Sequence, residues 1–329
     1  VMLALAAGYV YFGTMGWIES LFIGLKAGIS IIVLQALSKL AHRTLHNTAD
    51  WLIAIAGFIG IFFANLPFPL IIASAAFYGF VTSKPINDQW SIITLPNGRQ
   101  NFFTLLHWAA LWWLPILAVD YIFGAAQLAA IGYFFSQLAV VTFGGAYAVL
   151  AYMAQDVVGQ LGWLQAGTMM DGFGLAETTP GPLILVTEFV GFVTAFNAGG
   201  LAYGIAGAAI ALWATFIPCF LWIFVGAPYI EWLTHQPRLQ AALSSIMAAV
   251  VGVIANLFLW FVLHIVFMRI TDETVGPFTL LIPDITSADM TTITIAAACG
   301  VVAFWRKAGL FTVLTVAASF GILSGMITL

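Results

Sequence analysis

Apolar runs of helical length alternate with short polar segments along the whole chain. A helix that crosses a bilayer needs about 20 predominantly apolar residues, whereas a strand of an outer-membrane barrel needs about ten residues of alternating polarity. The runs here fit helices, and after an opening helical fragment they predict about ten spans. These spans are expected at residues 17–41, 51–66, 69–81, 102–121, 128–155, 163–196, 199–227, 239–268, 288–305 and 308–327. The pattern therefore predicts an all-α, polytopic integral membrane protein.

The composition agrees with this class. Hydrophobic residues occupy 63% of the 329 positions and charged residues only 7%, with a mean hydropathy of +1.07. Soluble domains, by comparison, carry roughly 25% charged residues. Membrane lipid is therefore the expected partner of the surface. The net charge of -4 is spread over loops and forms no basic patch that would favour nucleic acid.

The polar loops indicate an orientation in the membrane. Short loops that carry Lys and Arg face the cytoplasmic side of an inner (plasma) membrane. Four such loops fall on one side of the predicted spans, near Lys39, Lys84, Arg238 and Arg306. The acidic segment 272–284 is then expected as a loop on the other side. The polar segment 83–100 is the best candidate for a cytoplasmic linker between two membrane subdomains, residues 1–82 and 101–329.

Two neighbouring spans contain residues that interrupt helices. One carries Phe143-Gly144-Gly145 and the next carries Pro180-Gly181-Pro182. Proline removes a backbone donor and clashes with the preceding turn, while glycine adopts angles that a helix excludes. Irregular backbone is tolerated in a membrane only where it is buried in protein or lines a wet cavity. The two triplets therefore predict half-helices around a polar cavity, although simple packing kinks are the alternative.

Broken helices also supply groups that suit an anion. The half-helices that begin near Ala146 and after Pro182 would present free N–H groups and the positive ends of helix dipoles. Such discontinuous helices point at bound anions in many transporters. Hydroxyl groups near the breaks can donate further hydrogen bonds, at Thr142, Tyr147, Thr178 and Thr179.

Carboxyl groups within the same spans are the candidates for proton binding. A charged side chain at the bilayer centre costs at least about 2.5 kcal/mol, so an acid there indicates function. Burial favours the neutral form, which makes Glu177 and Glu188 the first candidates. Asp171 is a third candidate, with a place at the membrane interface as its alternative. Lys26 lies inside the first long span, where it pairs with an acid, helps to hold an anion or snorkels to the interface.

No motif of an enzyme is present in the chain. We find no nucleophile elbow, HExxH sequence, P-loop, or paired Cys and His ligands. The sequence therefore predicts neither enzymatic activity nor a cofactor or metal site.

The motifs and their order resemble the chromate ion transporter family. The similarity lies in "FGGAYAVLAYMAQDVVGQLGWL", "MDGFGLAETTPGPLILVTEFVGF", "LWATFIPCFLWIFVGAPYIEWL" and "AAVVGVIANLFLWFVLHIVF", and it runs from about residue 138 to residue 267. This region is similar to the second half of the long, two-domain members. Residues 24–45, "GLKAGISIIVLQALSKLAHRTL", resemble the segment that closes the first half.

The resemblance implies part of an inverted-repeat transporter, with two related halves in opposed orientations. Residues 1–82 would be the end of the first half and residues 101–329 the whole second half. Each half of the family normally carries its own FGG and PGP motif, and this chain has one copy of each. A segment upstream of Val1 is therefore expected.

The hypothesis from the sequence is a secondary active transporter that exports chromate, with sulfate as an analogue. Coupling would be to protons or to anion exchange. A passive oxyanion channel and a sulfate uptake transporter are the alternatives, and the sequence leaves open whether the protein is a monomer or a homodimer.

Overall fold

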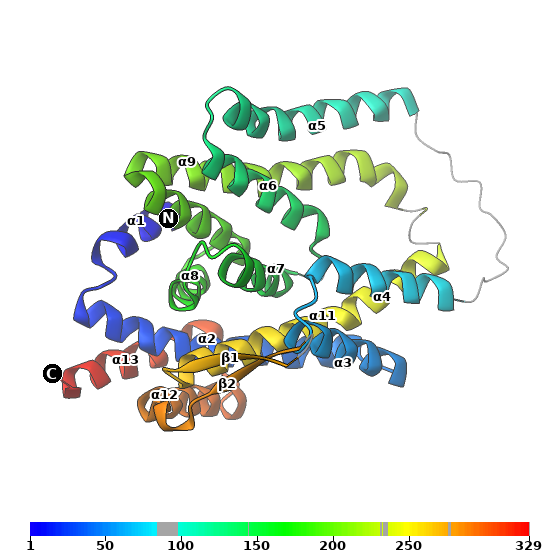
Figure 1. The fold of residues 1–329 in the computed structure, drawn as a ribbon. Helices are drawn as coiled ribbons and strands as arrows, with labels where there is room; N and C mark the ends of the chain where they lie inside the picture. The colour runs from blue at the N-terminus through cyan, green and yellow to red at the C-terminus, as the bar shows by residue number, and fades with distance from the viewer. Residues whose placement is uncertain (84–97, 144, 231, 233–235, 276–277, 329) are drawn as a thin grey trace. The chain divides into compact units, whose positions relative to one another are not determined.

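The computed structural model describes residues 1–83, 98–143, 145–230, 232, 236–275 and 278–328 (Figure 1). Most of the predicted linker, residues 83–100, therefore lies outside the described residues. The chain divides into two compact units that interleave along the sequence. The first comprises Val1–Ile71, Gly144–Val186 and Ala248–Leu329, and the second comprises Ile72–Phe143 and Thr187–Met247. Each unit is described by itself.

Helices form nearly all of both units, which confirms the predicted all-α membrane class. The first unit contains α1 (Met2–Phe12), α2 (Gly16–Thr44), α3 (Thr48–Phe62), α7 (Ala146–Met153), η1 (Ala154–Gln160), α8 (Ala166–Thr178), η2 (Leu183–Leu185), η4 (Ile285–Ser287), α12 (Met290–Gly300), η5 (Val301–Trp305) and α13 (Leu310–Thr328). The second contains α5 (Gly98–Tyr121), α6 (Ala126–Val141), most of α9 (Val186–Gly226) and η3 (Ala227–Tyr229). The boundary between the units falls within α4 (Phe68–Thr82) and α11 (Pro237–Val266).

Four helices among the described residues are long and apolar enough to cross a membrane. They cover Gly16–Thr44, Asn101–Tyr121, Leu183–Gly226 and Pro237–Val266. Shorter apolar helices account for the other predicted spans, and α3 and α4 have only 15 residues each. A span needs about 20 residues, so these two helices are short for a full crossing.

Small residues hold α2 against α13 in the first unit. A Cβ atom added at Gly24 would overlap with the Ala317 carbonyl oxygen, and one at Gly321 would lie 2.5 Å from the Ser20 carbonyl oxygen. Gly28 also approaches Ala317. Small residues four positions apart let membrane helices approach closely, and here they fix the position of α2.

The two predicted helix breaks are present. Helix α6 ends at Val141 and α7 begins at Ala146, while α8 ends at Thr178 and α9 begins at Val186 after the 3₁₀ turn η2. Gly145, the N-cap of α7, has φ 101°, a conformation that favours glycine. The broken helices predicted from the FGG and PGP triplets are thus confirmed as features of the fold.

The long helix α9 contains a further break, which separates two of the predicted spans. Gly200 has φ 76° and ψ -164°, so the helix reverses there. The two arms pack on each other in the second unit, because a Cβ atom at Gly191 would lie 2.6 Å from the Gly207 carbonyl oxygen. This agrees with the predicted separation of spans 163–196 and 199–227.

The acidic segment after α11 forms a β-hairpin, which the hydrophobic pattern did not predict. Strands β1 (Ile270–Val275) and β2 (Phe278–Pro283) are antiparallel, with Ile270 opposite Pro283 and Glu273 opposite Leu280. Across the base of the hairpin, Arg269 Nη2 lies 3.5 Å from Asp284 Oδ2. Main-chain pairing therefore orders a segment for which the sequence predicts a loop.

Candidate functional site

The two broken spans meet in the first unit. The Tyr147 hydroxyl donates to Glu177 Oε1 at 2.9 Å. Tyr147 is the second residue of α7, and Glu177 lies one residue before the end of α8. Helix α7 also packs against η2, which follows the PGP triplet. The FGG and PGP breaks therefore lie close together, and an anion site between them stays a prediction.

The backbone at both breaks is accessible. Gly145 precedes α7, Ala146 begins it and is half-buried, and Gly144 lies outside the described residues. Pro180, Gly181 and Pro182 are exposed, and Pro182 is the N-cap of η2. The first N–H groups of a helix have no acceptor within it. In α7 the Ala148 N–H donates to the Gly145 carbonyl oxygen at 3.1 Å, and an anion at this helix end stays a prediction.

The threonine hydroxyls at the breaks donate within their own helices. Thr178 and Thr179 both donate to the Leu175 carbonyl oxygen, at 3.0 and 2.6 Å, and Thr142 donates to Leu138 at 2.6 Å. A hydroxyl group has one hydrogen, so each must rotate before it can donate to an anion. The Tyr147 hydroxyl donates to Glu177 on another helix, so its hydrogen is also in use.

Three of the predicted site residues belong to the second unit. Thr142 and Phe143 follow α6, and the Phe143 side chain is exposed. Glu188 lies in the first turn of α9 and is buried. Their placement beside Tyr147 and Glu177 stays a prediction.

Asp171 lies in a second polar cluster, toward the start of α8. Its side chain is buried, it accepts from the Tyr9 hydroxyl at 2.9 Å on Oδ2, and Lys26 Nζ lies 3.2 Å from Oδ1. The sequence left three roles open for Lys26, and the structure shows it paired with an acid. Tyr9 was missed, since a single tyrosine in an apolar helix gives no signal of a partner 162 positions away.

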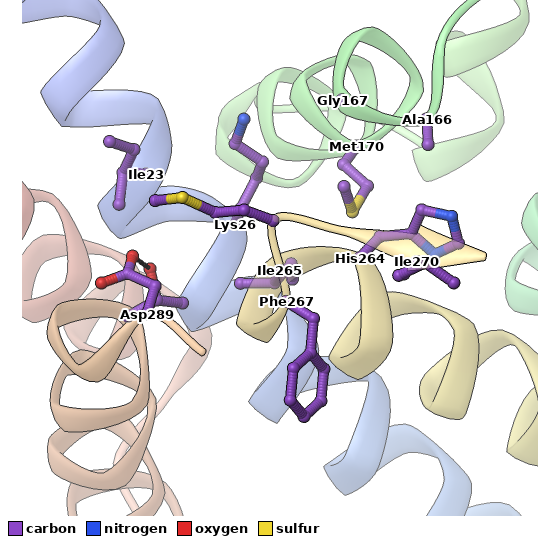
Figure 2. A pocket seen from close by; sticks show the side chains of 12 residues that line it. Ile23, Lys26, Ala166, Gly167, Met170, His264, Ile265, Phe267, Ile270 and Asp289 are labelled. Carbon is purple, nitrogen blue, oxygen red and sulfur yellow. Dashed lines mark hydrogen bonds between the residues drawn. The ribbon is translucent and has the colours of Figure 1, made fainter. Parts of the chain in front are cut away.

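A cavity of about 440 Å³ adjoins this cluster (Figure 2). Lys26 lines it from α2, Gly167 and Met170 from α8, His264 from α11 and Asp289 from the start of α12. In Figure 2 the Lys26 amino group points toward α8, away from Asp289. The cavity therefore leads to the ion pair between Lys26 and Asp171.

A second cavity, of about 370 Å³, shares His264 with the first. Asn65, Gln155 and Asn256 contribute its polar groups. Gln155 Nε2 donates to Leu66 O at 3.0 Å, which ties η1 to the loop between α3 and α4. No group of three or more metal-binding side chains lies together among the described residues.

Broken membrane helices that meet at a buried carboxyl group are typical of membrane transport proteins. A family model described as "Chromate transporter" matches residues 129–322, which is more than half of the chain. The chain belongs to the chromate transporter family.

Curated relatives agree with the family. The chain is 27% identical over 260 residues to the probable chromate transport protein of Synechococcus elongatus, covering 78% of this chain and 61% of that protein. It is 26% identical over 263 residues to the chromate transport protein of Cupriavidus metallidurans, covering 78% of this chain and 59% of the relative. An uncharacterized transporter of Methanocaldococcus jannaschii is 22% identical over 268 residues, covering 80% and 63%. The chain thus spans about three fifths of the length of these relatives, and no solved structure matches it.

Proposed function

We propose that this chain is the larger part of a secondary active transporter that exports chromate across an inner membrane. Membership of the chromate transporter family supports the substrate. Sulfate is a tetrahedral dianion of similar size, so it is the expected competitor. Residues 1–82 would close one half of an inverted repeat, and residues 101–329 would form the other.

The observation that carries this proposal is the hydrogen bond between Tyr147 and Glu177. It joins the two breaks where half-helix N-termini can receive an oxyanion. Exposed irregular backbone at Gly145 and at residues 180–182 fits a water-filled passage, because lipid does not tolerate it. The first N–H groups of α7 would replace water around the dianion, together with the Tyr147 hydroxyl once it accepts from a protonated Glu177 instead of donating to it.

Glu177 is the proposed proton carrier. A carboxylate repels a dianion, so the two occupy one site only if the carboxyl group takes up a proton. The Tyr147 hydroxyl can serve both states of Glu177, since a hydroxyl group donates to a carboxylate and accepts from a carboxylic acid. Glu188 is the second candidate, and proton coupling or anion exchange would drive the export.

The test is chromate flux in proteoliposomes with an imposed pH gradient and sulfate as competitor. Flux in the wild type is expected to follow the gradient, and Glu177→Gln/Glu188→Gln should remove that dependence. Tyr147→Phe deletes one interhelical hydrogen bond, which is worth about 0.6 to 1.7 kcal/mol in membranes. It should lower flux by about three- to eighteenfold.

Tyr133→Phe is the matched control, since its hydroxyl donates to the exposed Asp120 at 2.7 Å. It should leave flux unchanged. Wild-type flux that does not depend on the pH gradient would favour the passive oxyanion channel. An unaltered gradient dependence in Glu177→Gln/Glu188→Gln would refute the coupling role.

A further inference from the structure

The ion pair between Lys26 and Asp171 joins α2 to α8 beside the 440 Å³ cavity. Lys26 lies between Gly24 and Gly28, whose close contacts with α13 fix this part of α2. Its side chain is 21% exposed, against 10% for Asp171. Lys26, and not Asp171, is among the residues that line the cavity, so the lysine is the member of the pair that borders it.

We propose that Lys26 binds an oxyanion that enters this cavity, and that Asp171 is the resident counter-ion with which the oxyanion competes. This inference rests on the proposed function and adds a binding residue outside the FGG and PGP breaks. An ammonium group carries three N–H donors, and Lys26 Nζ lies 3.2 Å from Asp171 Oδ1, an atom that accepts no hydrogen bond among the described residues. An oxyanion in the cavity is therefore within the reach of the same group.

Asp171 keeps a partner when an oxyanion draws Lys26 away. Tyr9 donates to Oδ2 and Lys26 pairs with Oδ1, so the two partners use different oxygens. Loss of the ammonium contact leaves the Tyr9 hydrogen bond in place. A buried acid with a second donor is less costly to separate from its cation than one with none.

The other acid on the cavity wall has its own donors. Asp289 accepts from the Thr291 N–H at 2.9 Å and from the Thr292 hydroxyl at 2.5 Å. It stands at the N-terminus of α12, where the helix dipole favours a negative charge. Its carboxylate therefore competes less for Lys26 than Asp171 does, in line with the direction of the Lys26 side chain in Figure 2.

Four variants separate this role from a structural one. Lys26→Gln removes the cation, Lys26→Arg keeps it, Asp171→Asn removes the competitor, and Lys26→Gln/Asp171→Asn removes both charges. Removing one member of a buried ion pair is destabilising because it leaves an uncompensated charge, whereas the double variant leaves neither charge behind. The double variant thus keeps the test valid even if Lys26→Gln alone fails to fold. The exposed pair, Arg269→Gln/Asp284→Asn, is the control.

The measurement is chromate binding to purified protein in detergent by calorimetry, with flux measured in parallel. Lys26→Gln and the double variant should bind chromate about tenfold more weakly or worse, as expected for loss of a charge-assisted contact. Lys26→Arg and the control should bind as the wild type does. Asp171→Asn should bind at least as tightly as the wild type, because it frees the cation.

Two results would overturn the inference while chromate flux in the wild type persists. One is wild-type binding by the double variant. The other is equal weakening by Asp171→Asn and Lys26→Gln, as a purely structural pair requires. Absence of both binding and flux in the wild type would instead overturn the proposed function, and with it this inference.

Discussion

Gly24→Ala tests whether the contact of α2 with α13 sets the position of the Lys26 cluster. The added methyl group would overlap with the Ala317 carbonyl oxygen and lie 2.9 Å from Gly321 Cα, both backbone atoms. Ordinary contact begins near 3.4 Å. Neither atom belongs to a flexible side chain, so the two helices must move apart.

The size of the effect follows from two opposing contributions. Overpacking a well-packed site costs typically about 1 to 3 kcal/mol. Alanine in a helix interior gains roughly 0.5 to 1 kcal/mol over glycine. A net loss between about 0 and about 2.5 kcal/mol is therefore expected, together with a shift of Lys26, two residues along α2, relative to Asp171.

The assay is reversible unfolding of the purified protein in mixed micelles, with Gly8→Ala as the matched control. Gly8 also lies inside a helix, but nothing stands within 4 Å of the position that a Cβ atom would take there. The control should be neutral or slightly stabilising. If Gly24→Ala proves as stable as Gly8→Ala, the close approach of α2 and α13 is not what positions this cluster.

Two further predictions concern the PGP break and the hairpin. Pro180→Ala/Pro182→Ala should restore a continuous helix and abolish chromate flux while the protein still reaches the membrane; unchanged flux in vesicles would contradict this. Hydrogen bonds from Thr286, and then the charge of Arg269, hold the pKa of Asp284 below its usual range. A depressed pKa stabilises the fold above the unfolded value of about 3.9, and this contribution is lost as the pH falls through the folded value. Amide exchange in the hairpin, corrected for intrinsic rates, should therefore accelerate between about pH 5 and pH 3 in the wild type but not in Asp284→Asn.

The helix breaks were predictable because their causes are local. Proline and glycine act on the backbone at their own positions, so the ends of α6 and α8 follow from Gly145 and from the PGP triplet. The reversal at Gly200 follows in the same way, since φ 76° suits glycine. In these cases a short segment contains all the relevant chemistry.

The hairpin was not predictable from hydrophobic periodicity, since its stability comes from pairing. Asp272 and Glu273 mark the segment as polar, and the antiparallel register from Ile270 to Pro283 supplies the hydrogen bonds that order it. The Gly276-Pro277 dipeptide is a turn signal between two β-branched or apolar stretches, and it is the feature that would have found the hairpin.

The sequence could indicate which residues belong to the candidate site, but not which side chains they contact. Charge and polarity within an apolar run single out Asp171, Glu177 and Lys26. Their partners depend on how distant helices pack, so neither the Tyr9 contact with Asp171 nor the Tyr147 contact with Glu177 follows from spacing. The bonds of Thr178 and Thr179 to the Leu175 carbonyl oxygen are different, because they are local and of a kind that threonine often makes in helices, so the sequence could have indicated them.

The two carboxyl groups of α8 have partners of different kinds, and this argues for different roles. Asp171 and Glu177 are six positions apart, which leaves their side chains about 120° apart around the helix. Asp171 faces a cation on α2, whereas Glu177 faces a neutral hydroxyl on α7. A cation favours the charged carboxylate, and a hydroxyl serves either form. Glu177 is therefore the better candidate for carrying a proton, and Asp171 for holding Lys26 until an oxyanion arrives. Glu177→Gln should then change the response to the pH gradient, while Asp171→Asn should keep that response and bind the anion at least as tightly as the wild type.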